Sequence, residues 1–256
     1  MASEGWQVGG ACEQGTSHKK LTIPCQDAWC HHIHQTGEVI IAIADGAGSA
    51  SRSRDGAQLV VRESTSLLAT RLGEPQPEND DGWRELMAEV FRHSQKALER
   101  VATHEEEPLA LFATTLTCVL SNAEWLVVCQ VGDGLVVAQR PDTTLFTAVH
   151  PQRGNYANET YFLTMPEALN SMQIHVYREP VHAMAAMTDG LLRLAVRLPE
   201  FEPHAPFFMP LFDFVRTASG EEQKSEQFSA FLLSDPICSR TDDDKTLVLA
   251  APLQSS

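Results

Sequence analysis

Four aspartates are the residues of this sequence whose types and spacing suggest chemistry. Three of them flank apolar runs typical of buried strands, and the other follows a short Pro-Cys-Gln segment. They are, in chain order, Asp27, Asp45, Asp189 and Asp243. Carboxylates at the ends of rigid strands can converge at one edge of a sheet, where a cation or a proton must relieve their repulsion. The pattern therefore predicts a site for a hard divalent ion.

Oxygen ligands of this kind favour Mg²⁺ or Mn²⁺, whereas Zn²⁺ would call for more His or Cys. Gly46, directly after Asp45, leaves room for its carbonyl to approach a metal and tolerates left-handed dihedral angles. Between two ions about 3.5–4 Å apart, a bridging water becomes acidic enough to attack phosphorus near neutral pH. Asp-Gly is also a common turn pair, so this hypothesis depends on the whole set of acids.

The elements that must position these acids follow from the apolar pattern. The acids Asp45 and Asp189 follow predicted buried strands at residues 38–44 and 181–187, and Asp243 precedes a strand at residues 245–251. Helical spacing predicts four helices, at residues 55–72, 81–104, 207–219 and 222–233. Strand patterns between the helix pairs predict an antiparallel meander at residues 112–120, 125–131, 135–140 and 144–149.

This order of elements favours an α+β layered sandwich over alternating βαβ units. The chain has 256 residues, 43% of them hydrophobic, which suits one domain, residues 1–256. P-loop and Gly-x-Ser-x-Gly motifs are missing from the sequence, which argues against nucleotide hydrolysis by a P-loop and against serine acyl transfer.

Charge and cysteine usage narrow the partners and the compartment. A formal net charge of -15 disfavours binding to nucleic acid and to anionic lipid. No apolar stretch reaches the roughly 18 residues that a membrane span needs, and no basic segment with a following apolar run begins the sequence. The six cysteines are scattered, so we expect reduced thiols and a cytoplasmic protein.

Seven short motifs occur across nearly the whole sequence in an order that resembles one known family. They are Gly15-Thr16-Ser17-His18, Pro24-Cys25-Gln26-Asp27-Ala28, Ala44-Asp45-Gly46-Ala47-Gly48-Ser49, Phe112-Ala113-Thr114-Thr115, Val131-Gly132-Asp133-Gly134, Thr188-Asp189-Gly190 and Thr241-Asp242-Asp243-Asp244-Lys245-Thr246. The sequence resembles the metal-dependent protein phosphatases, the type 2C serine/threonine phosphatases, and most closely their compact bacterial branch.

The resemblance implies a central antiparallel β-sandwich flanked by helix pairs, a four-layer αββα arrangement with two Mn²⁺ or Mg²⁺ ions at one end. Asp45 would bridge both ions, Asp189 and Asp243 would hold one, and the Gly46 carbonyl would touch the other. Asp27 would act through metal-bound water. The resemblance assigns a structural role to Asp133.

Two positions depart from the family pattern. Many members carry a phosphate-binding Arg five residues before the first acid, where this sequence has Thr22. His18, Lys19 and Lys20 are the candidates to supply that positive charge, although a basic pair in a loop is commonly a solvated feature. The third-metal Asp that we expect before the Thr114-Thr115 motif also has no match, since residues 109–111 are Leu-Ala-Leu.

Three further features of the sequence each have a functional and a purely structural interpretation. Cys30, His32 and His34 would share one face of a strand and could form a soft-metal site, although neighbouring His residues are more often surface groups. Residues 154–159 suit a substrate-contacting flap or a simple surface loop. The aromatic run 206–214 predicts core packing first and a partner-docking patch second.

The resulting hypothesis is a metal-dependent phosphatase acting on phosphoserine or phosphothreonine in proteins, with a cognate kinase as the candidate partner that supplies the substrate. The alternative is a catalytically weak phosphatase-like module that binds a phosphorylated or signalling partner, which the missing Arg favours.

Overall fold

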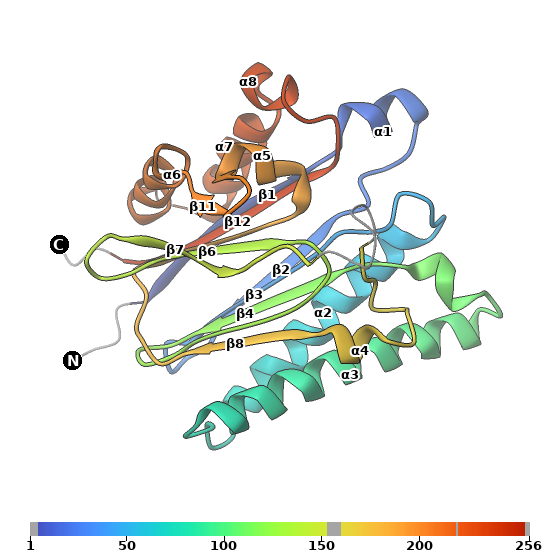
Figure 1. Cartoon of the computed structure of the whole chain (residues 1–256), viewed down its shortest axis with the longest axis horizontal. Helices are drawn as coiled ribbons and strands as arrows, with labels where there is room; N and C mark the ends of the chain where they lie inside the picture. The colour runs from blue at the N-terminus through green and yellow to red at the C-terminus, as the bar shows by residue number, and fades with distance from the viewer. Residues whose placement is uncertain (1–4, 153–159, 219, 254–256) are drawn as a thin grey trace.

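Two five-stranded antiparallel sheets stack at the centre of the molecule (Figure 1). The computed structural model describes residues 5–152, 160–218 and 220–253. The first sheet has the order β1-β12-β9-β6-β7, with bounds Trp6–Glu13, Lys245–Pro252, Ala183–Met187, Leu135–Gln139 and Leu145–Val149. The second has the order β2-β3-β4-β5-β8, with bounds Ala28–Ile33, Val39–Ala44, Leu116–Ser121, Leu126–Val131 and Gln173–Tyr177.

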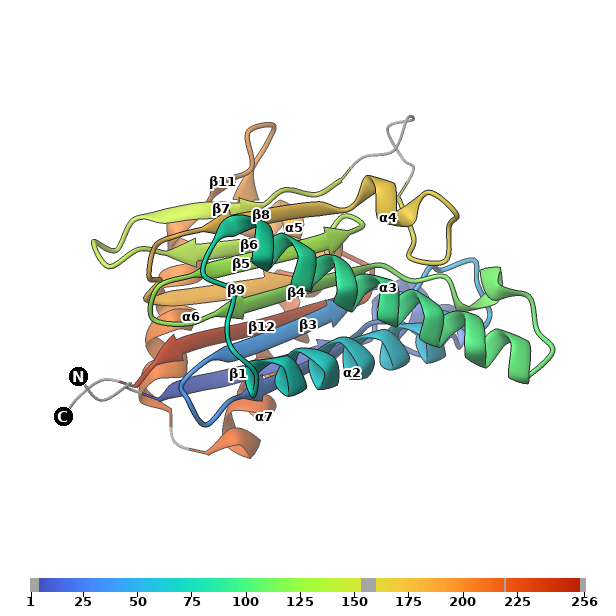
Figure 2. The ribbon, with the colours of Figure 1, turned by 90° about the horizontal axis from the view of Figure 1, so that it is seen from below.

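A pair of helices covers the outer face of each sheet, so the molecule has the four αββα layers that we expected. Helices α2 (Ser53–Leu72) and α3 (Asp80–His104) lie across the second sheet, as Figure 2 shows. Helices α6 (Ala205–Thr217) and α7 (Glu221–Leu232) pack on the first sheet. The short elements are α1 (Thr16–Leu21), η1 (Leu109–Phe112), α4 (Ala168–Ser171), η2 (Asp189–Leu191), α5 (Leu192–Ala195), β10 (Val196–Arg197), β11 (Glu202–Pro203) and α8 (Asp235–Cys238).

Strand β3 shows why the central strands of the two sheets have continuous apolar sequences. Val39, Ile41 and Ile43 pack between the two sheets, whereas Ile40 and Ala42 point toward α2 and α3. All five are essentially inaccessible to solvent. Because both faces of the strand are covered, apolar residues occupy every position instead of alternating with polar ones. Burying each large apolar side chain contributes about 1.5–3 kcal/mol to stability.

The start of α3 is fixed by local chemistry. The side chain of Asn79 accepts a hydrogen bond from the backbone N–H of Gly82 at 2.9 Å. Asp80 and Asp81 lie in the first turn, where carboxylates favour the positive end of the helix dipole. The aromatic run in α6 is core, as expected, because Phe208 and Phe212 are fully buried against the first sheet.

Several element predictions need correction. The run predicted as a strand from residue 112 begins as the 3-10 turn η1, and the strand itself starts only at Leu116. The edge strands β1 and β8 and the helix α1 were not predicted. Every residue of β8 is only partly buried, and β1 carries two glycines, so neither has a strong period-two pattern. Within the described ranges, no helix combines the length and apolar character needed to cross a bilayer.

Helix α2 passes very close to η1, which is followed by the two threonines, Thr114 and Thr115, that bind the backbone of Asp45. An added Cβ at Gly56 would lie 2.2 Å from the carbonyl oxygen of Phe112. Gly56→Ala is therefore expected to lower the free energy of unfolding by about 1–3 kcal/mol, although Ala normally stabilises a helix interior relative to Gly. Urea denaturation measures the change. Gly5→Ala is the control, because its Cβ would meet only Leu253 at an ordinary 3.5 Å; a stabilised Gly56→Ala protein would contradict this packing.

Candidate metal centre

Asp45 is fixed at the end of β3 by two threonines that precede β4. Its backbone N–H donates to Oγ1 of Thr115 at 2.9 Å. Its carbonyl oxygen accepts from the N–H of Thr115 at 2.8 Å and from Oγ1 of Thr114 at 3.0 Å. Both backbone groups of Asp45 are thus satisfied within the protein. The carboxylate is left to face the cavity described below.

Gly46 is required for close packing rather than for an unusual backbone conformation. It lies outside the left-handed region, which corrects one of the two reasons given for a glycine here. A Cβ at this position would lie 2.7 Å from the carbonyl oxygen of Gln26 and 2.9 Å from Cβ of Ser53. The small residue lets the turn after β3 approach the segment that carries Asp27.

Asp189 and Asp243 meet because β9 and β12 are antiparallel neighbours. Met187 pairs with Leu247, so the end of β9 lies beside the start of β12. The N–H of Thr188 also donates to the carbonyl oxygen of Thr246 at 3.2 Å. Residues just beyond these strand ends therefore share one end of the sandwich, although they come from opposite ends of their strands.

A cavity of ≈ 350 Å³ opens at this end of the sandwich. Its lining includes Gly46 and three of the four predicted acids, Asp45, Asp189 and Asp243. Two further aspartates, Asp133 and Asp242, also line it. Asp133, to which the resemblance assigns a structural role, accepts a hydrogen bond at Oδ2 from Oγ1 of Thr160 at 2.7 Å within the cavity wall. The Gly-Asp-Gly signal was visible in the sequence, but it did not show where the side chain points.

Burial and repulsion among the acids raise the pKa values of Asp45 and Asp189. The pKa of Asp45 lies well above its ordinary value because of burial first and then because of repulsion from Asp27, Asp189, Asp133 and Asp243. Burial, followed by repulsion from Asp133 and Asp243, raises the pKa of Asp189 to about 7. A hydrogen bond with Asp45 partly offsets this shift. Protons or cations are needed to hold these acids together.

Asp27 lies behind the cavity rather than in its lining. Its Oδ2 accepts hydrogen bonds from Oγ1 of Thr188 and of Thr246, both at 2.8 Å. Its Oδ1 is buried and has no hydrogen-bond partner among the residues that the structure describes. Burial raises the pKa of Asp27 to about 7, although the two threonines lower it. An unpaired buried carboxylate oxygen is the kind of group that an ion or an ordered water satisfies.

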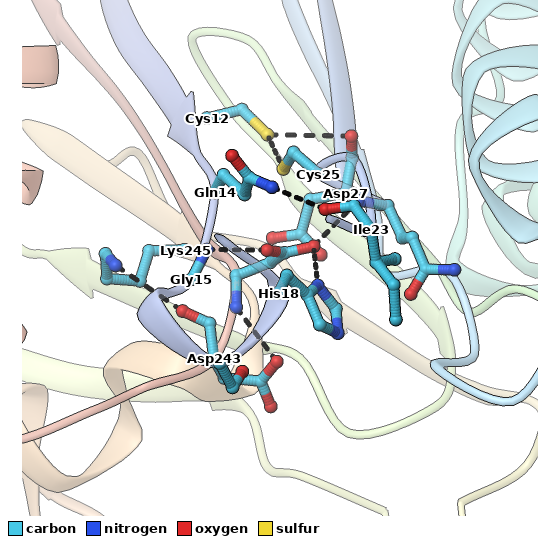
Figure 3. A network of polar contacts seen from close by, with 12 residues as sticks. Cys12, Gln14, Gly15, His18, Ile23, Cys25, Asp27, Asp243 and Lys245 are labelled. Carbon is cyan, nitrogen blue, oxygen red and sulfur yellow. Dashed lines mark hydrogen bonds and ion pairs between the residues drawn. The ribbon is translucent and has the colours of Figure 1, made fainter. Parts of the chain in front are cut away.

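Asp244 is the organising residue that the sequence did not reveal. It is buried, and its Oδ1 and Oδ2 accept from the N–H groups of Gly15 and Gln26, each at 2.7 Å. Nδ1 of His18 lies 2.9 Å from Oδ2 in an ion-pair contact. Figure 3 shows this network beside Asp27 and Asp243. The only sequence signal was a run of three acids, which does not distinguish the buried member from its exposed neighbours.

The three basic candidates for phosphate contact differ in their exposure and in their position relative to the cavity. His18 lines the cavity, and 13% of its side chain is exposed. Lys19 and Lys20 follow it in α1, but both are exposed and neither lines the cavity. Thr22, at the position of the family's Arg, is an exposed residue that ends α1 with a φ of 59°.

The donor set fits a hard divalent ion. Among the described residues that line it, the cavity presents carboxylate oxygens, the Gly46 segment and the imidazole of His18, and no thiol. In the part of the chain that the structure describes, no three His, Cys, Asp or Glu side chains form a preassembled metal cage. Water would have to complete the coordination of an ion here, which is usual for Mg²⁺.

Among the described residues, Cys30, His32 and His34 do not form the soft-metal site considered from the sequence. Cys30 and His32 face an open cavity beside α2, whereas His34 contacts Thr36 and Glu38 instead. The flap considered at residues 154–159 lies outside the described residues.

Comparison with known proteins agrees with this architecture. The family model described as Protein phosphatase 2C matches residues 14–232. Serine/threonine-protein phosphatase 3 of Escherichia coli (strain K12) is 33% identical over 251 residues, which are 96% of this chain and 98% of that protein. The solved structure of the S. agalactiae serine/threonine phosphatase superposes with a TM-score of 0.67 at 12% identity, covering 97% of this chain and 100% of that one.

A further solved structure is the catalytic domain of the serine threonine protein phosphatase PstP in complex with 2 manganese ions. It superposes with a TM-score of 0.65 at 17% identity, covering 97% of this chain and 99% of that one. At these identities the superpositions establish a common fold.

The raised pKa values predict how the metal-free protein responds to pH. Between the ordinary Asp value of 3.8 and about 7, the folded protein binds more protons at Asp27 and Asp189 than the unfolded chain does. Its free energy of unfolding should therefore fall as the pH rises through this window. Urea denaturation with a chelator at several pH values measures the slope, and Mn²⁺ should restore stability at neutral pH.

Asp45→Asn is the matched variant for this measurement, because it removes one charge without changing the size of the side chain. It should show a shallower fall with pH and a smaller gain from Mn²⁺. Equal slopes and equal Mn²⁺ effects in the two proteins would mean that the carboxylates do not interact as described.

Proposed function

The chain belongs to the metal-dependent protein phosphatase 2C family and is a serine/threonine protein phosphatase, and we propose that it hydrolyses phosphomonoesters of proteins at the aspartate-lined cavity. The observation that carries the proposal is the convergence of five aspartates, from four segments of the chain, on one cavity. No side-chain nucleophile is required in this mechanism. The substrate class follows from the family, and a cognate kinase is the partner that we propose to supply it.

We assign two Mn²⁺ or Mg²⁺ ions to this cavity. Two such ions would supply an acidified water as the nucleophile and positive charge for the phosphoryl oxygens. Asp45 is the residue proposed to contact both, with Asp189 and Asp243 at one and the Gly46 carbonyl at the other. Their mutual repulsion without a cation supports this assignment.

Asp27 is proposed to act one layer behind these residues. Thr188 and Thr246 hold one of its carboxylate oxygens, which leaves the unpaired Oδ1 to orient a water or an ion. Since Thr188 precedes Asp189 and Thr246 follows the acidic run, this arrangement also connects the segments of Asp189 and Asp243. Asp27 therefore has both a positioning and a proton-holding role in the proposal.

His18 is the residue that we propose to contact the phosphate, in place of the Arg that many relatives carry. It faces the cavity, and the carboxylate of Asp244 lies 2.9 Å from its Nδ1. A buried carboxylate at this distance holds the imidazole in place at the cavity wall. Lys19 and Lys20 have no comparable anchor.

We also propose that residues 1–256 act as one domain in the cytoplasm. Core side chains from both sheets pack together, as Ile43 of β3 and Val248 of β12 illustrate, which supports a single unit. The six free cysteines support a reducing compartment.

Release of phosphate from a phosphoserine peptide tests the reaction. With Mn²⁺ present, Asp45→Asn and Asp189→Asn should each lower kcat on the order of 10²-fold or more, because each removes a charge that holds the ions. Asp55→Asn is a matched control on the exposed surface of α2. Unchanged rates in both cavity variants would refute the assignment, and tight Mn²⁺ binding without turnover would instead favour a regulatory module.

Variants of His18, Lys19 and Lys20 provide a second, independent test. His18→Ala should lower kcat/KM by about 10-fold to 100-fold, because a hydrogen-bonding contact to the phosphate is lost. Lys19 and Lys20 lie beside His18 on the same short helix, and Lys19→Ala and Lys20→Ala should each retain activity close to that of the unmodified protein. The same peptide assay measures all three, and a larger loss from either lysine variant would move the phosphate contact away from His18.

A further inference from the structure

Two cysteine thiols lie in contact directly behind the proposed catalytic cavity. Sγ of Cys12, on β1, is 3.1 Å from Sγ of Cys25, in the segment that precedes β2. Figure 3 shows the two sulfur atoms facing each other. Both residues are partly accessible to solvent. A disulfide requires a sulfur separation of about 2.05 Å, so the two atoms would need to approach by only about 1 Å.

We propose that Cys12 and Cys25 form a redox-active dithiol, a modification site for hydroperoxides that controls the position of Asp27. In the first step one thiol loses its proton and attacks the peroxide, giving a sulfenic acid and one water or alcohol. The sulfur of the second cysteine then attacks the sulfenic sulfur and releases water. The sum is oxidation of two thiols to one disulfide and reduction of one peroxide.

The surroundings of the pair distinguish it from the other cysteines. Cys118 and Cys129 also pair, across β4 and β5, but both are fully buried and out of reach of an oxidant. Cys30 and Cys238 are partly accessible but have no neighbouring thiol in the described structure.

A disulfide here would act on the proposed site through the backbone. Sγ of Cys12 lies 3.5 Å from the carbonyl oxygen of Asp27, and Cys25 is two residues before Asp27. Cys12 also pairs with Thr246, whose hydroxyl holds the Asp27 carboxylate. Gln26, which lies between Cys25 and Asp27 in the chain, donates its N–H to Asp244. Closing the bond would shift this segment relative to Asp244 and Thr246, which hold Gln26 and Asp27 in place.

The first experiment follows the thiols and needs no phosphatase activity. The full chain is treated with hydrogen peroxide, its remaining thiols are alkylated, and the peptides are mapped by mass spectrometry. We expect a Cys12–Cys25 crosslink with the loss of two hydrogen atoms and its reversal by dithiothreitol. Cys12→Ser and Cys25→Ser should each abolish the crosslink, whereas the matched controls Cys30→Ser and Cys238→Ser should retain it.

The mapping in the unmodified chain decides the site even if a Ser variant folds poorly. Crosslinks through Cys30 or Cys238, disulfide-linked dimers on a non-reducing gel, or irreversible oxidation of Cys12 and Cys25 without a crosslink would overturn the proposal. Circular dichroism confirms that the variants compared are folded.

The second experiment measures the consequence for turnover, which rests on the proposed function. The crosslinked protein should show a reversible fall in kcat on the order of tenfold, as expected when a residue supporting a metal site is displaced, while Cys12→Ser keeps its activity in peroxide. Full crosslinking with unchanged kcat would overturn the control of Asp27. If the protein had no activity in either state, the proposed function would fail while the thiol mapping would still stand.

Discussion

Carboxylates from four segments of the chain face one cavity at the end of the β-sandwich, where burial and mutual repulsion raise the pKa values of Asp45 and Asp189. On a flexible surface such a group would relax by turning its side chains apart into solvent. Here the acids follow or precede strands that are buried on both faces, so their backbones cannot separate without disturbing the core. The strain is therefore retained in the folded protein, and a divalent cation is the species that relieves it while keeping the acids ionised.

The surrounding layers serve to keep this arrangement rigid. Threonines connect the acid-bearing segments to one another, through the backbone at Asp45 and through the side chain at Asp27. The outer helices bury the far faces of both sheets and leave one end of the sandwich for the cavity. A site built on strand ends in this way is held more precisely than one built on loops alone.

The two neighbouring acids that precede β12 have different roles. Asp243 is exposed to the cavity, whereas Asp244 is buried and binds the backbone of Gly15 and Gln26. Through Asp244 the C-terminal strand fixes α1, which carries His18, and the segment with Cys25 and Asp27. A small movement of that segment would therefore reach both His18, the proposed phosphate contact, and Asp27, which is why we propose the thiol pair beside it as a place for control.

The sequence alone determined the α+β class, the two long helix pairs, the buried strands around Asp45 and Asp189, and the family, because apolar periodicity and motif order are local properties of the chain. It also pointed to Asp45, Asp189 and Asp243 as acids that could meet. Only the tertiary structure decided that Asp133 faces the cavity, that Asp244 and not Asp243 is buried, that His18 rather than Lys19 faces the cavity, and that Cys12 touches Cys25. These facts depend on side-chain direction in irregular segments and on pairs as distant as Gly15 and Asp244, 229 residues apart, and no local pattern encodes such contacts.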